Sequence, residues 1–276
     1  LWGDFTDRDQ KHLYLIGTLS AQAIVSAHLV ADHREDLRAA QLIQQNLLPK
    51  VMPRIPGFDV AAAMVPAKMV GGDYFDFLSF SGGRPAFAVA DVSGKGLPAA
   101  LLMSNFQAIM RSQAVFSSSC CECVANVNRM LLNLPVPDGR FITLFLALLD
   151  PSSKELFFCN AGHNPPVLVR PDESFHKLST GGRFLGVAGV SDEFPHEEGS
   201  VLLSEGDVLV IYSDGVTETL SETGEMFEEK RLLETVKPHR FHSAPEILSA
   251  VTESVRRFAS KAPATDDLTL MVIKAL

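Results

Sequence analysis

Four short acidic motifs carry the residues best suited to chemistry in this chain of 276 residues. Each holds at least one aspartate, and three of them border an apolar run rich in β-branched residues. The motifs are Gly71-Gly72-Asp73, Ala90-Asp91-Val92-Ser93-Gly94-Lys95-Gly96, Ser213-Asp214-Gly215 and Asp266-Asp267-Leu268-Thr269. Aspartates at strand ends can converge in a fold, where their charges repel one another and are costly to desolvate. Clustered carboxylates need a cation, and oxygen ligands favour Mg²⁺ or Mn²⁺ over zinc. The motifs therefore predict a metal site made mostly of aspartates.

An ordinary turn explains each motif when it is taken alone. Aspartate next to glycine is among the commonest turn signals, and a lone aspartate in such a place is more often a turn or cap residue than a ligand. The metal-site interpretation depends on four such motifs occurring within one domain.

Composition limits the classes of function. The length allows one large domain with an appendage or two modest domains, and an apolar content of 46% is enough for a good core. A net charge of −9 with scattered basic residues argues against nucleic-acid binding. No uninterrupted apolar run approaches about 20 residues, so we expect no membrane span. The chain starts at Leu1 without an initiator methionine, which suggests a fragment of a longer protein.

The cysteines do not have the spacing of a zinc module. Cys120, Cys121 and Cys123 are bunched together, and Cys159 stands apart. We interpret them as reduced thiols of a cytoplasmic protein. The alternative is a cysteine-rich metal cluster, for which the paired ligand spacing is missing.

Residues 1–50 are expected to form a long helical linker. Thr6 and Asp9 suit a helix start, and Pro49 and Pro53 end the helix. A heptad pattern of apolar residues predicts packing on a partner helix and hence a homodimer. Its positions are Ile16, Leu19, Ala23, Val30, Leu37, Ala40 and Leu47, with Ser26 and His33 interrupting the seam. The alternative is an amphipathic helix that lies on its own domain.

Residues 51–276 are predicted to form one globular domain. Runs of β-branched and aromatic residues predict strands, which occupy 58–65, 74–80, 85–92, 141–149, 155–160, 167–169, 208–212 and 268–273. Helices are expected at 97–115, 123–134, 228–236 and 244–258. Strands follow strands and helices come in pairs, which indicates an α+β fold with largely antiparallel sheets. Two sheets packed face to face, with helices outside, fit this order.

Six motifs taken in order resemble one known family. They are Leu47-Leu48-Pro49, Val70-Gly71-Gly72-Asp73-Tyr74-Phe75-Asp76, Ala90-Asp91-Val92-Ser93-Gly94-Lys95-Gly96, Asn160-Ala161-Gly162-His163-Asn164-Pro165-Pro166, Tyr212-Ser213-Asp214-Gly215-Val216-Thr217-Glu218 and Asp266-Asp267-Leu268-Thr269. From residue 41 to its end the chain resembles PPM/PP2C-type metal-dependent protein phosphatases, and it is most similar to their bacterial SpoIIE/RsbU-like branch. The resemblance implies an antiparallel β-sandwich flanked by helices, the PP2C-like αββα fold.

The same resemblance implies hydrolysis of phosphoserine or phosphothreonine in proteins with two Mn²⁺ or Mg²⁺ ions. Asp73 would bind one metal, Asp91 would bridge both, and the carbonyl of Val92 would add a ligand. Asp214 and Asp266 would hold the other metal. Asp267 stands where many relatives carry asparagine, so the choice between it and its neighbour as ligand stays open.

Other polar residues near these motifs have two interpretations each. Lys95 and Lys68 are the nearest candidates to contact phosphate, and either can be a solvated surface lysine. His163 lies where eukaryotic relatives have an aspartate linked to a third metal, which argues against a third ion here. Its role is that of a general acid or of a structural hydrogen-bonding residue. Glu218 is interpreted as a helix or turn carboxylate rather than a ligand. Eukaryotic members of the family bind phosphate with an arginine, and no arginine in this sequence is an obvious counterpart.

Two stretches near the N-terminus are Phe5-Thr6-Asp7-Arg8-Asp9 and Ala21-Gln22-Ala23-Ile24. With them the N-terminal segment resembles the closing helix of a GAF sensor domain, which implies an upstream sensor that controls activity through the linker. The resemblance to the SpoIIE/RsbU-like phosphatases also implies a substrate, a phosphoserine on a STAS-type anti-anti-sigma factor. We therefore expect a sensor-regulated serine/threonine phosphatase. The alternative is a catalytically weak module of the same fold that binds a metal or a partner.

Overall fold

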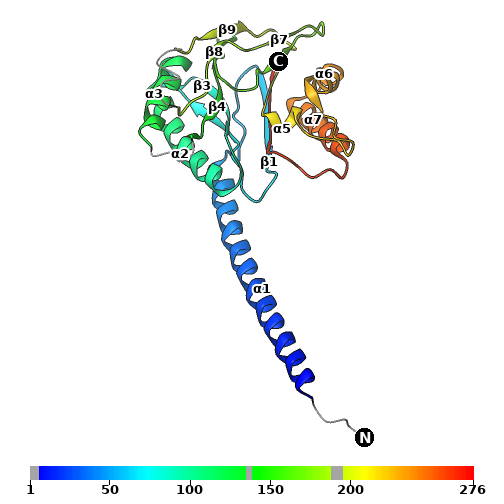
Figure 1. Cartoon of the computed structure of the whole chain (residues 1–276). Coiled ribbons are helices and arrows are strands. Elements are labelled where there is room, and N and C mark those ends of the chain that lie inside the picture. Colours follow the sequence, from blue (N-terminus) through cyan, green and yellow to red (C-terminus); the bar gives the residue numbers. More distant parts are fainter. Residues whose placement is uncertain (1–5, 135–138, 188–194) are drawn as a thin grey trace. The chain divides into compact units, whose positions relative to one another are not determined.

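The computed structural model describes residues 6–134, 139–187 and 195–276. The chain divides into two units, Leu1–Ile43 and Gln44–Leu276, and each is described by itself (Figure 1).

Helix α1 (Asp7–Leu47) provides the first unit, and its last turn belongs to the second. It begins as expected, because Thr6 and Asp9 cap it reciprocally: the Thr6 N–H donates to Asp9 Oδ2 at 2.9 Å, and the Asp9 N–H donates to Thr6 Oγ1 at 3.3 Å. Residues 6–36 are all exposed.

Helix α1 also combines great length with apolar character. It contains an 18-residue window with a mean hydropathy of 1.5, so it is long and apolar enough to cross a membrane by length and composition. The expectation of no membrane span considered uninterrupted apolar runs, and it overlooked a stretch in which small polar residues are mixed with apolar ones. A single helix of this kind near the N-terminus is weak evidence for a membrane segment, because core helices and signal sequences share this length and composition.

Two sheets form the centre of the second unit. The five-stranded sheet has the spatial order β1 (Phe58–Val65), β11 (Leu268–Ala275), β10 (Val208–Tyr212), β6 (Val167–Val169) and β7 (Phe175–Lys177). The other sheet has the order β2 (Tyr74–Ser79), β3 (Pro85–Val92), β4 (Ile142–Asp150), β5 (Glu155–Ala161) and β8 (Gly181–Gly182), and β9 (Gly199–Leu202) also pairs with β5. All of these pairings are antiparallel except that of β5 with β8.

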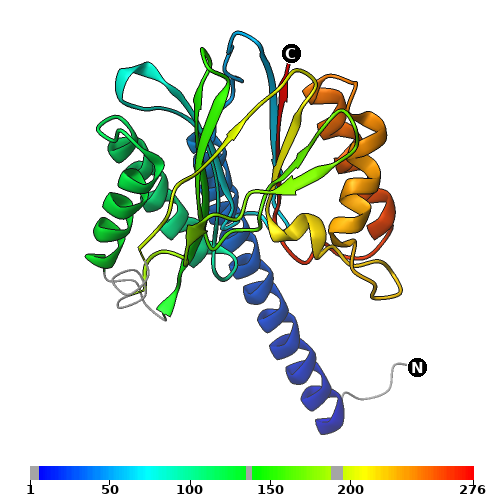
Figure 2. The same ribbon diagram turned by 90° about the horizontal axis from the view of Figure 1, so that it is seen from above.

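Helices cover both outer faces of the sandwich. Helices α2 (Leu97–Ala114) and α3 (Cys120–Leu132) lie on the six-stranded sheet, and α6 (Glu228–His239) and α7 (Ala244–Ala259) lie on the other side (Figure 2). Two short helices, η1 (Ser81–Gly83) and α5 (Asp214–Thr217), lie in connections. The expected α+β sandwich flanked by helices is confirmed.

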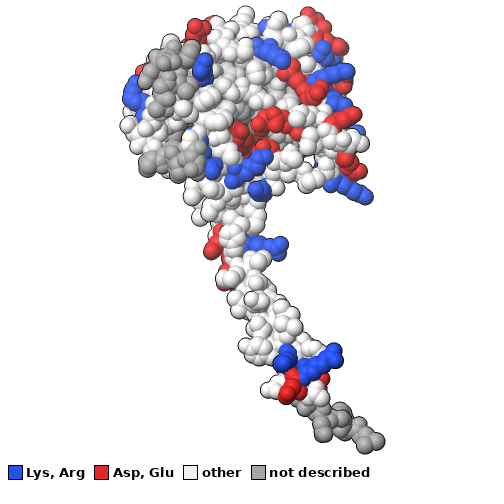
Figure 3. Space-filling model, viewed as in Figure 1, with Lys and Arg blue, Asp and Glu red and all other residues white. Residues whose placement is uncertain are grey.

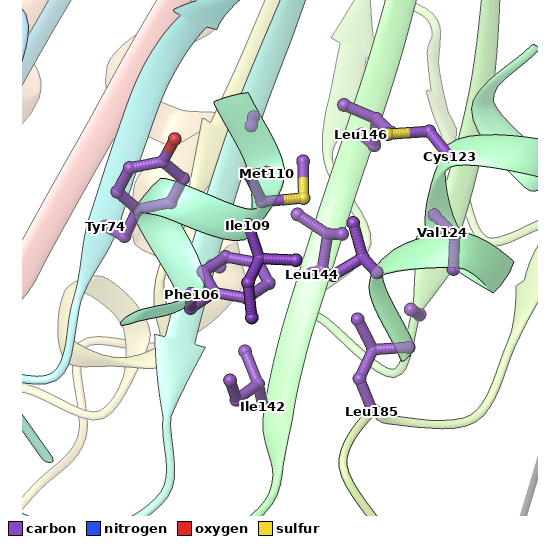
Figure 4. Close-up of a cluster of buried hydrophobic side chains, with 14 of the residues drawn as sticks. Tyr74, Phe106, Ile109, Met110, Cys123, Val124, Ile142, Leu144, Leu146 and Leu185 are labelled. Carbon is purple, nitrogen blue, oxygen red and sulfur yellow. The ribbon is translucent and has the colours of Figure 1, made fainter. Parts of the chain in front are cut away.

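Side-chain alternation along the strands explains the layers. In β3, Ala86, Ala88 and Ala90 pack under α2 and α3, whereas Phe87 and Val89 point into the space between the sheets. Small residues on the helix side let the helices approach closely. Figure 4 shows this helix-facing core, in which side chains of β2, β4, α2 and α3 meet. A third core lies between the five-stranded sheet and the pair α6 and α7.

The eight expected strands and four expected helices are present, with shifts at their ends. Helix α3 starts at Cys120, earlier than expected, because Ser119 caps it by accepting a hydrogen bond from the Glu122 N–H at 3.2 Å. Strands β7, β8 and β9 and helix α5 were not expected. They are two to four residues long and lack an apolar run.

Candidate metal centre

Two of the aspartates lie at the end of a strand pair in the six-stranded sheet. Asp73 immediately precedes β2, and Asp91 is the penultimate residue of β3. Because Tyr74 pairs with Ala90 across the two antiparallel strands, Asp73 and Asp91 lie beside each other. Asp73 is 1% exposed, so it is held inside the domain.

The other acidic motifs lie at the end of a strand pair in the five-stranded sheet. Asp214 opens α5, separated from the end of β10 by Ser213 alone, and Asp266 and Asp267 precede β11. The pairing of Tyr212 with Leu270 brings these two motifs together. Segments nearly 200 residues apart in sequence therefore converge, since Asp73 accepts a hydrogen bond from Thr269, separated from it by 196 positions.

A pocket of about 260 Å³ joins the two sets of carboxylates. Its lining combines acidic, basic, aromatic and small polar residues: Asp91, Ser93, Gly94, Lys95, Phe141, Thr143, His163, Asn164, Asp214 and Asp266. Figure 3 shows acidic side chains gathered next to basic ones on this domain. The structure thus brings together three of the expected metal ligands on one surface, with Asp73 buried behind them.

Burial and nearby negative charges make Asp73, Asp91 and Asp214 hard to ionise. Burial, followed by the charges of Asp214 and Asp266, raises the pKa of Asp91 to about 7. Burial, followed by the charges of Asp266 and Glu218, raises the pKa of Asp214 to about 6. Burial, and then the charge of Asp91, raises the pKa of Asp73 well above its usual range. A cation in their midst would relieve this unfavourable energy.

Asp267 has a different environment from Asp266. Its Oδ1 accepts a hydrogen bond from the Ala67 N–H and its Oδ2 accepts one from the Gly72 N–H, both at 2.8 Å. A Cβ atom at Gly71 would lie 1.9 Å from Asp267 Oδ2, and one at Gly215 would lie 2.0 Å from its carbonyl oxygen. Only glycine therefore fits at these positions, and Asp267 holds the loop before Asp73 in place.

The two lysines behave differently. Lys95 Nζ lies 2.6 Å from Asp266 Oδ2 and donates to the Thr265 carbonyl at 2.6 Å. The hydrogen bond with Asp266 raises the pKa of Lys95, so it remains charged. Lys68 is exposed and does not line the pocket.

His163 is a neutral member of the pocket wall. Burial lowers its pKa to about 4, so the ring carries no charge at pH 7. Its Nδ1 lies 2.9 Å from Thr143 Oγ1, and its backbone N–H donates to Asn160 Oδ1 at 2.8 Å. These contacts fix the ring and support the structural interpretation of this residue.

Three further residues support the aspartates and were not expected from the sequence. Thr269 donates from its hydroxyl to Asp73 Oδ2, and Ser213 Oγ accepts the Thr269 N–H at 2.9 Å. Gln44 is 5% exposed; its Nε2 donates to the Gly71 carbonyl at 2.8 Å, and its Oε1 accepts the Gly71 N–H at 3.1 Å. Thr269 belongs to a recognised motif, but nothing in the sequence distinguishes Gln44 from its neighbour Gln45.

The donor set fits hard divalent cations, although the side chains are not arranged around an ion. Within residues 6–134, 139–187 and 195–276, no three His, Cys, Asp or Glu side chains form a ready-made metal cluster. Thr269 engages Asp73, and Lys95 engages Asp266. An ion that bound to both of these carboxylates would have to displace Thr269 and Lys95 from them. The same result gives no support to a cluster at the cysteines, all four of which are free.

Comparison with known proteins identifies the family of this chain. Residues 81–276 match the SpoIIE family, described as Stage II sporulation protein E. The chain is 31% identical over 242 residues to the phosphoserine phosphatase RsbU of Bacillus subtilis, covering 87% of this chain and 70% of RsbU. It is 28% identical to the protein IcfG of Synechocystis, of which it spans 42%.

Solved structures have the same fold. The SiaA-PP2C domain of Pseudomonas aeruginosa superposes with a TM-score of 0.78 at 20% identity, covering 88% of this chain and 97% of that domain. Two more distant PP2C-fold structures contain metal ions. PstP, with two manganese ions, has 17% identity and a TM-score of 0.58, covering 79% of this chain and 98% of PstP. RsbX, with magnesium, has 15% identity and a TM-score of 0.59, covering 81% of this chain and 98% of RsbX.

The fold and the site define a metal-dependent protein serine/threonine phosphatase domain of the PP2C class. Within that class, the chain belongs to the SpoIIE family.

Proposed function

We propose that this domain removes phosphate from a phosphoserine or phosphothreonine of a regulatory protein with the help of two Mn²⁺ or Mg²⁺ ions. When bound, such a pair of ions lowers the pKa of a water molecule and offsets charge on the phosphoryl oxygens. The observation that carries the proposal is the convergence of Asp91, Asp214 and Asp266 on one pocket, where burial and nearby negative charges raise the pKa values of Asp91 and Asp214.

The residues proposed to hold the ions follow from their positions. Asp91 lies between Asp73 and the carboxylates of the other sheet, which suits a bridging ligand. The carbonyl oxygen of Val92 lies close to Gly72, because a Cβ atom on that glycine would be 2.6 Å from the oxygen. Asp214 and Asp266 line the pocket together. Asp267 is assigned a supporting role, because both of its oxygens already accept backbone N–H groups.

The proposed substrate is a phosphoserine on a STAS-type anti-anti-sigma factor, and it rests on the similarity to RsbU, a phosphoserine phosphatase. The test is phosphate release from such a phosphorylated protein by the Mn²⁺-loaded domain, with a phosphotyrosine peptide as control. Phosphate release from the phosphoserine protein, without release from the phosphotyrosine peptide, supports the proposal. A folded, Mn²⁺-loaded domain that releases nothing supports the alternative, a regulatory module that binds metal or partner without turnover.

Control by an upstream sensor is proposed to act through Gln44. This residue sits near the end of α1, and its two hydrogen bonds reach the backbone of Gly71, two residues before Asp73. A shift of the helix would therefore move the loop that carries a proposed metal ligand. The helical linker (1–50) would then connect a sensor to the phosphatase domain (51–276) in the cytoplasm.

The variant Gln44→Ala tests this connection. It leaves the buried N–H and carbonyl groups of Gly71 without partners, and we expect Mn²⁺ to bind about tenfold more weakly, as for other losses of support around metal ligands. Gln45→Ala is the matched control, because Gln45 is the exposed neighbour. Isothermal titration with Mn²⁺ measures both, and equal affinities in the two variants contradict the proposed coupling.

Dimerisation through α1 is proposed from its exposed apolar side chains. Ile16, Leu19 and Val30 of the heptad seam are 59%, 56% and 57% exposed. A second copy of the helix would bury these side chains, and each Å² of apolar surface removed from water would stabilise the dimer by about 25 cal/mol.

The double variant Val30→Glu and Leu37→Glu places charges in the seam, and we expect it to be monomeric by light scattering. Leu29→Glu is the control: Leu29 is 64% exposed but lies outside the seam. A double variant that stays dimeric contradicts this interface. Binding of wild-type α1 to lipid vesicles would favour a membrane segment instead.

A further inference from the structure

An arginine that the sequence did not single out contacts a residue that lines the acidic pocket, although it is not itself a lining residue. Arg140 is half-buried and stands two residues before β4. Its Nη1 donates to the Ser93 carbonyl at 3.1 Å. Gly94 and Phe141 line the pocket together with Ser93, so the guanidinium group adjoins this wall.

Gly94 gives the guanidinium group its room. Its φ of +95° is one that residues with a side chain rarely adopt, and a Cβ atom there would lie 2.3 Å from Arg140 Nη1. The turn at Ser93 and Gly94 and the side chain of Arg140 therefore pack directly on each other, which holds the positive charge beside the pocket.

Most of the donors of this guanidinium group are not engaged. An arginine has five N–H donors in a planar fork, and one hydrogen bond, to Ser93, engages Arg140 among the described residues. Lys95, which does line the pocket, is already held by Asp266 and Thr265. Within the described part of the chain, Arg140 is thus a cation next to the pocket with N–H donors left for an anion.

We propose that Arg140 binds the phosphoryl group of the substrate through the N–H groups that Ser93 leaves free. The inference rests on the proposed function, since a phosphoryl group must enter the pocket. Planar guanidinium groups bind phosphate oxygens in pairs and hold them in a fixed orientation. With metal ions among the aspartates, the phosphate would be held between those ions and Arg140.

Binding of inorganic phosphate to the Mn²⁺-saturated domain, measured by isothermal titration, tests this role without requiring turnover. Arg140→Gln keeps an N–H donor for the backbone but loses the charge, and we expect it to bind phosphate about tenfold more weakly, the loss of a charge-assisted pair. Arg140→Lys keeps the charge without the fork and is expected to fall between that variant and the wild type. The control is Arg257→Gln, because Arg257 is an exposed residue of α7 that pairs with Glu253.

Several results would overturn the role of Arg140. They are phosphate affinity equal to the wild type in a folded Arg140→Gln, an equal loss in Arg257→Gln, and no phosphate binding by the Mn²⁺-loaded wild type. Titration with Mn²⁺ is run in parallel, and a loss of Mn²⁺ affinity with unchanged phosphate affinity at saturation also counts against it. Hydrolysis of the phosphoprotein is scored separately. If the wild type hydrolyses the phosphoprotein and Arg140→Gln binds phosphate as tightly as the wild type, the role of Arg140 is wrong. The proposal that the domain is a phosphatase is then still supported.

Discussion

Asp91→Asn is expected to abolish most phosphatase activity, by about a thousandfold, because the proposed bridging ligand contributes several kcal/mol of charge stabilisation through the ions it holds. The same substitution should stabilise the metal-free domain. Burial and the charges of Asp214 and Asp266 raise the pKa of Asp91 to about 7, so its ionised form is disfavoured in the fold. Asparagine has nearly the same shape and no charge, and we expect at least about 1 kcal/mol of added stability at pH 8.

Activity and stability must move in opposite directions for this prediction to hold. Phosphate release at saturating Mn²⁺ and urea unfolding in EDTA measure the two quantities. Asp172→Asn serves as control, since Asp172 is an exposed turn residue that accepts hydrogen bonds from Ser174. Full activity in Asp91→Asn contradicts the bridging role, and a loss of metal-free stability contradicts the electrostatic picture of the site.

The melting temperature of the domain is expected to depend on pH and metal together. The carboxyl pKa values of Asp91 and Asp214 rise from an unfolded value of 3.8 to about 7 and about 6. The folded state therefore binds more protons than the unfolded chain between these values. The stability that these two groups contribute is complete below about pH 4 and is lost as the pH rises to about 7.

Mn²⁺ should restore what deprotonation removes, because it binds the ionised carboxylates of the folded state. At a free concentration of about 100 times Kd it adds about 2.7 kcal/mol, which corresponds to about 5 to 10 °C for a domain of this size. Thermal melts with EDTA or Mn²⁺ at pH 5 and pH 8 measure both effects. Two results would contradict this coupling between metal binding and ionisation. One is an increase in melting temperature with Mn²⁺ that is as large at pH 5 as at pH 8, and the other is the same increase in Asp91→Asn.

The sequence was informative where chemistry coincides with strong local pattern. The apolar runs of β3 and β10 predict buried strands, and Asp91 and Asp214 were found because they lie at the ends of those runs. Strands β7 to β9 were missed because they are short and are defined by pairing with β5 and β6 rather than by their own composition.

The supporting contacts of the site could not be predicted because they join distant segments. Gln44 reaches Gly71 across 27 positions, and Thr269 reaches Asp73 across 196. The difference between Asp266 and Asp267 is likewise tertiary. The sequence alone does not distinguish two adjacent aspartates. The backbone N–H groups that donate to Asp267 come from a loop 195 to 200 positions away.

The arrangement of metal ions is the most direct test of the account. Crystals of the domain soaked with Mn²⁺ would show, by anomalous scattering, where the ions lie. We expect two peaks about 3.5 to 4 Å apart, as in other two-metal sites, both within ligand distance of Asp91, with Asp73 on one side and Asp214 and Asp266 on the other. Peaks away from these carboxylates, or fully loaded protein with Asp91 touching neither ion, would contradict the central claim.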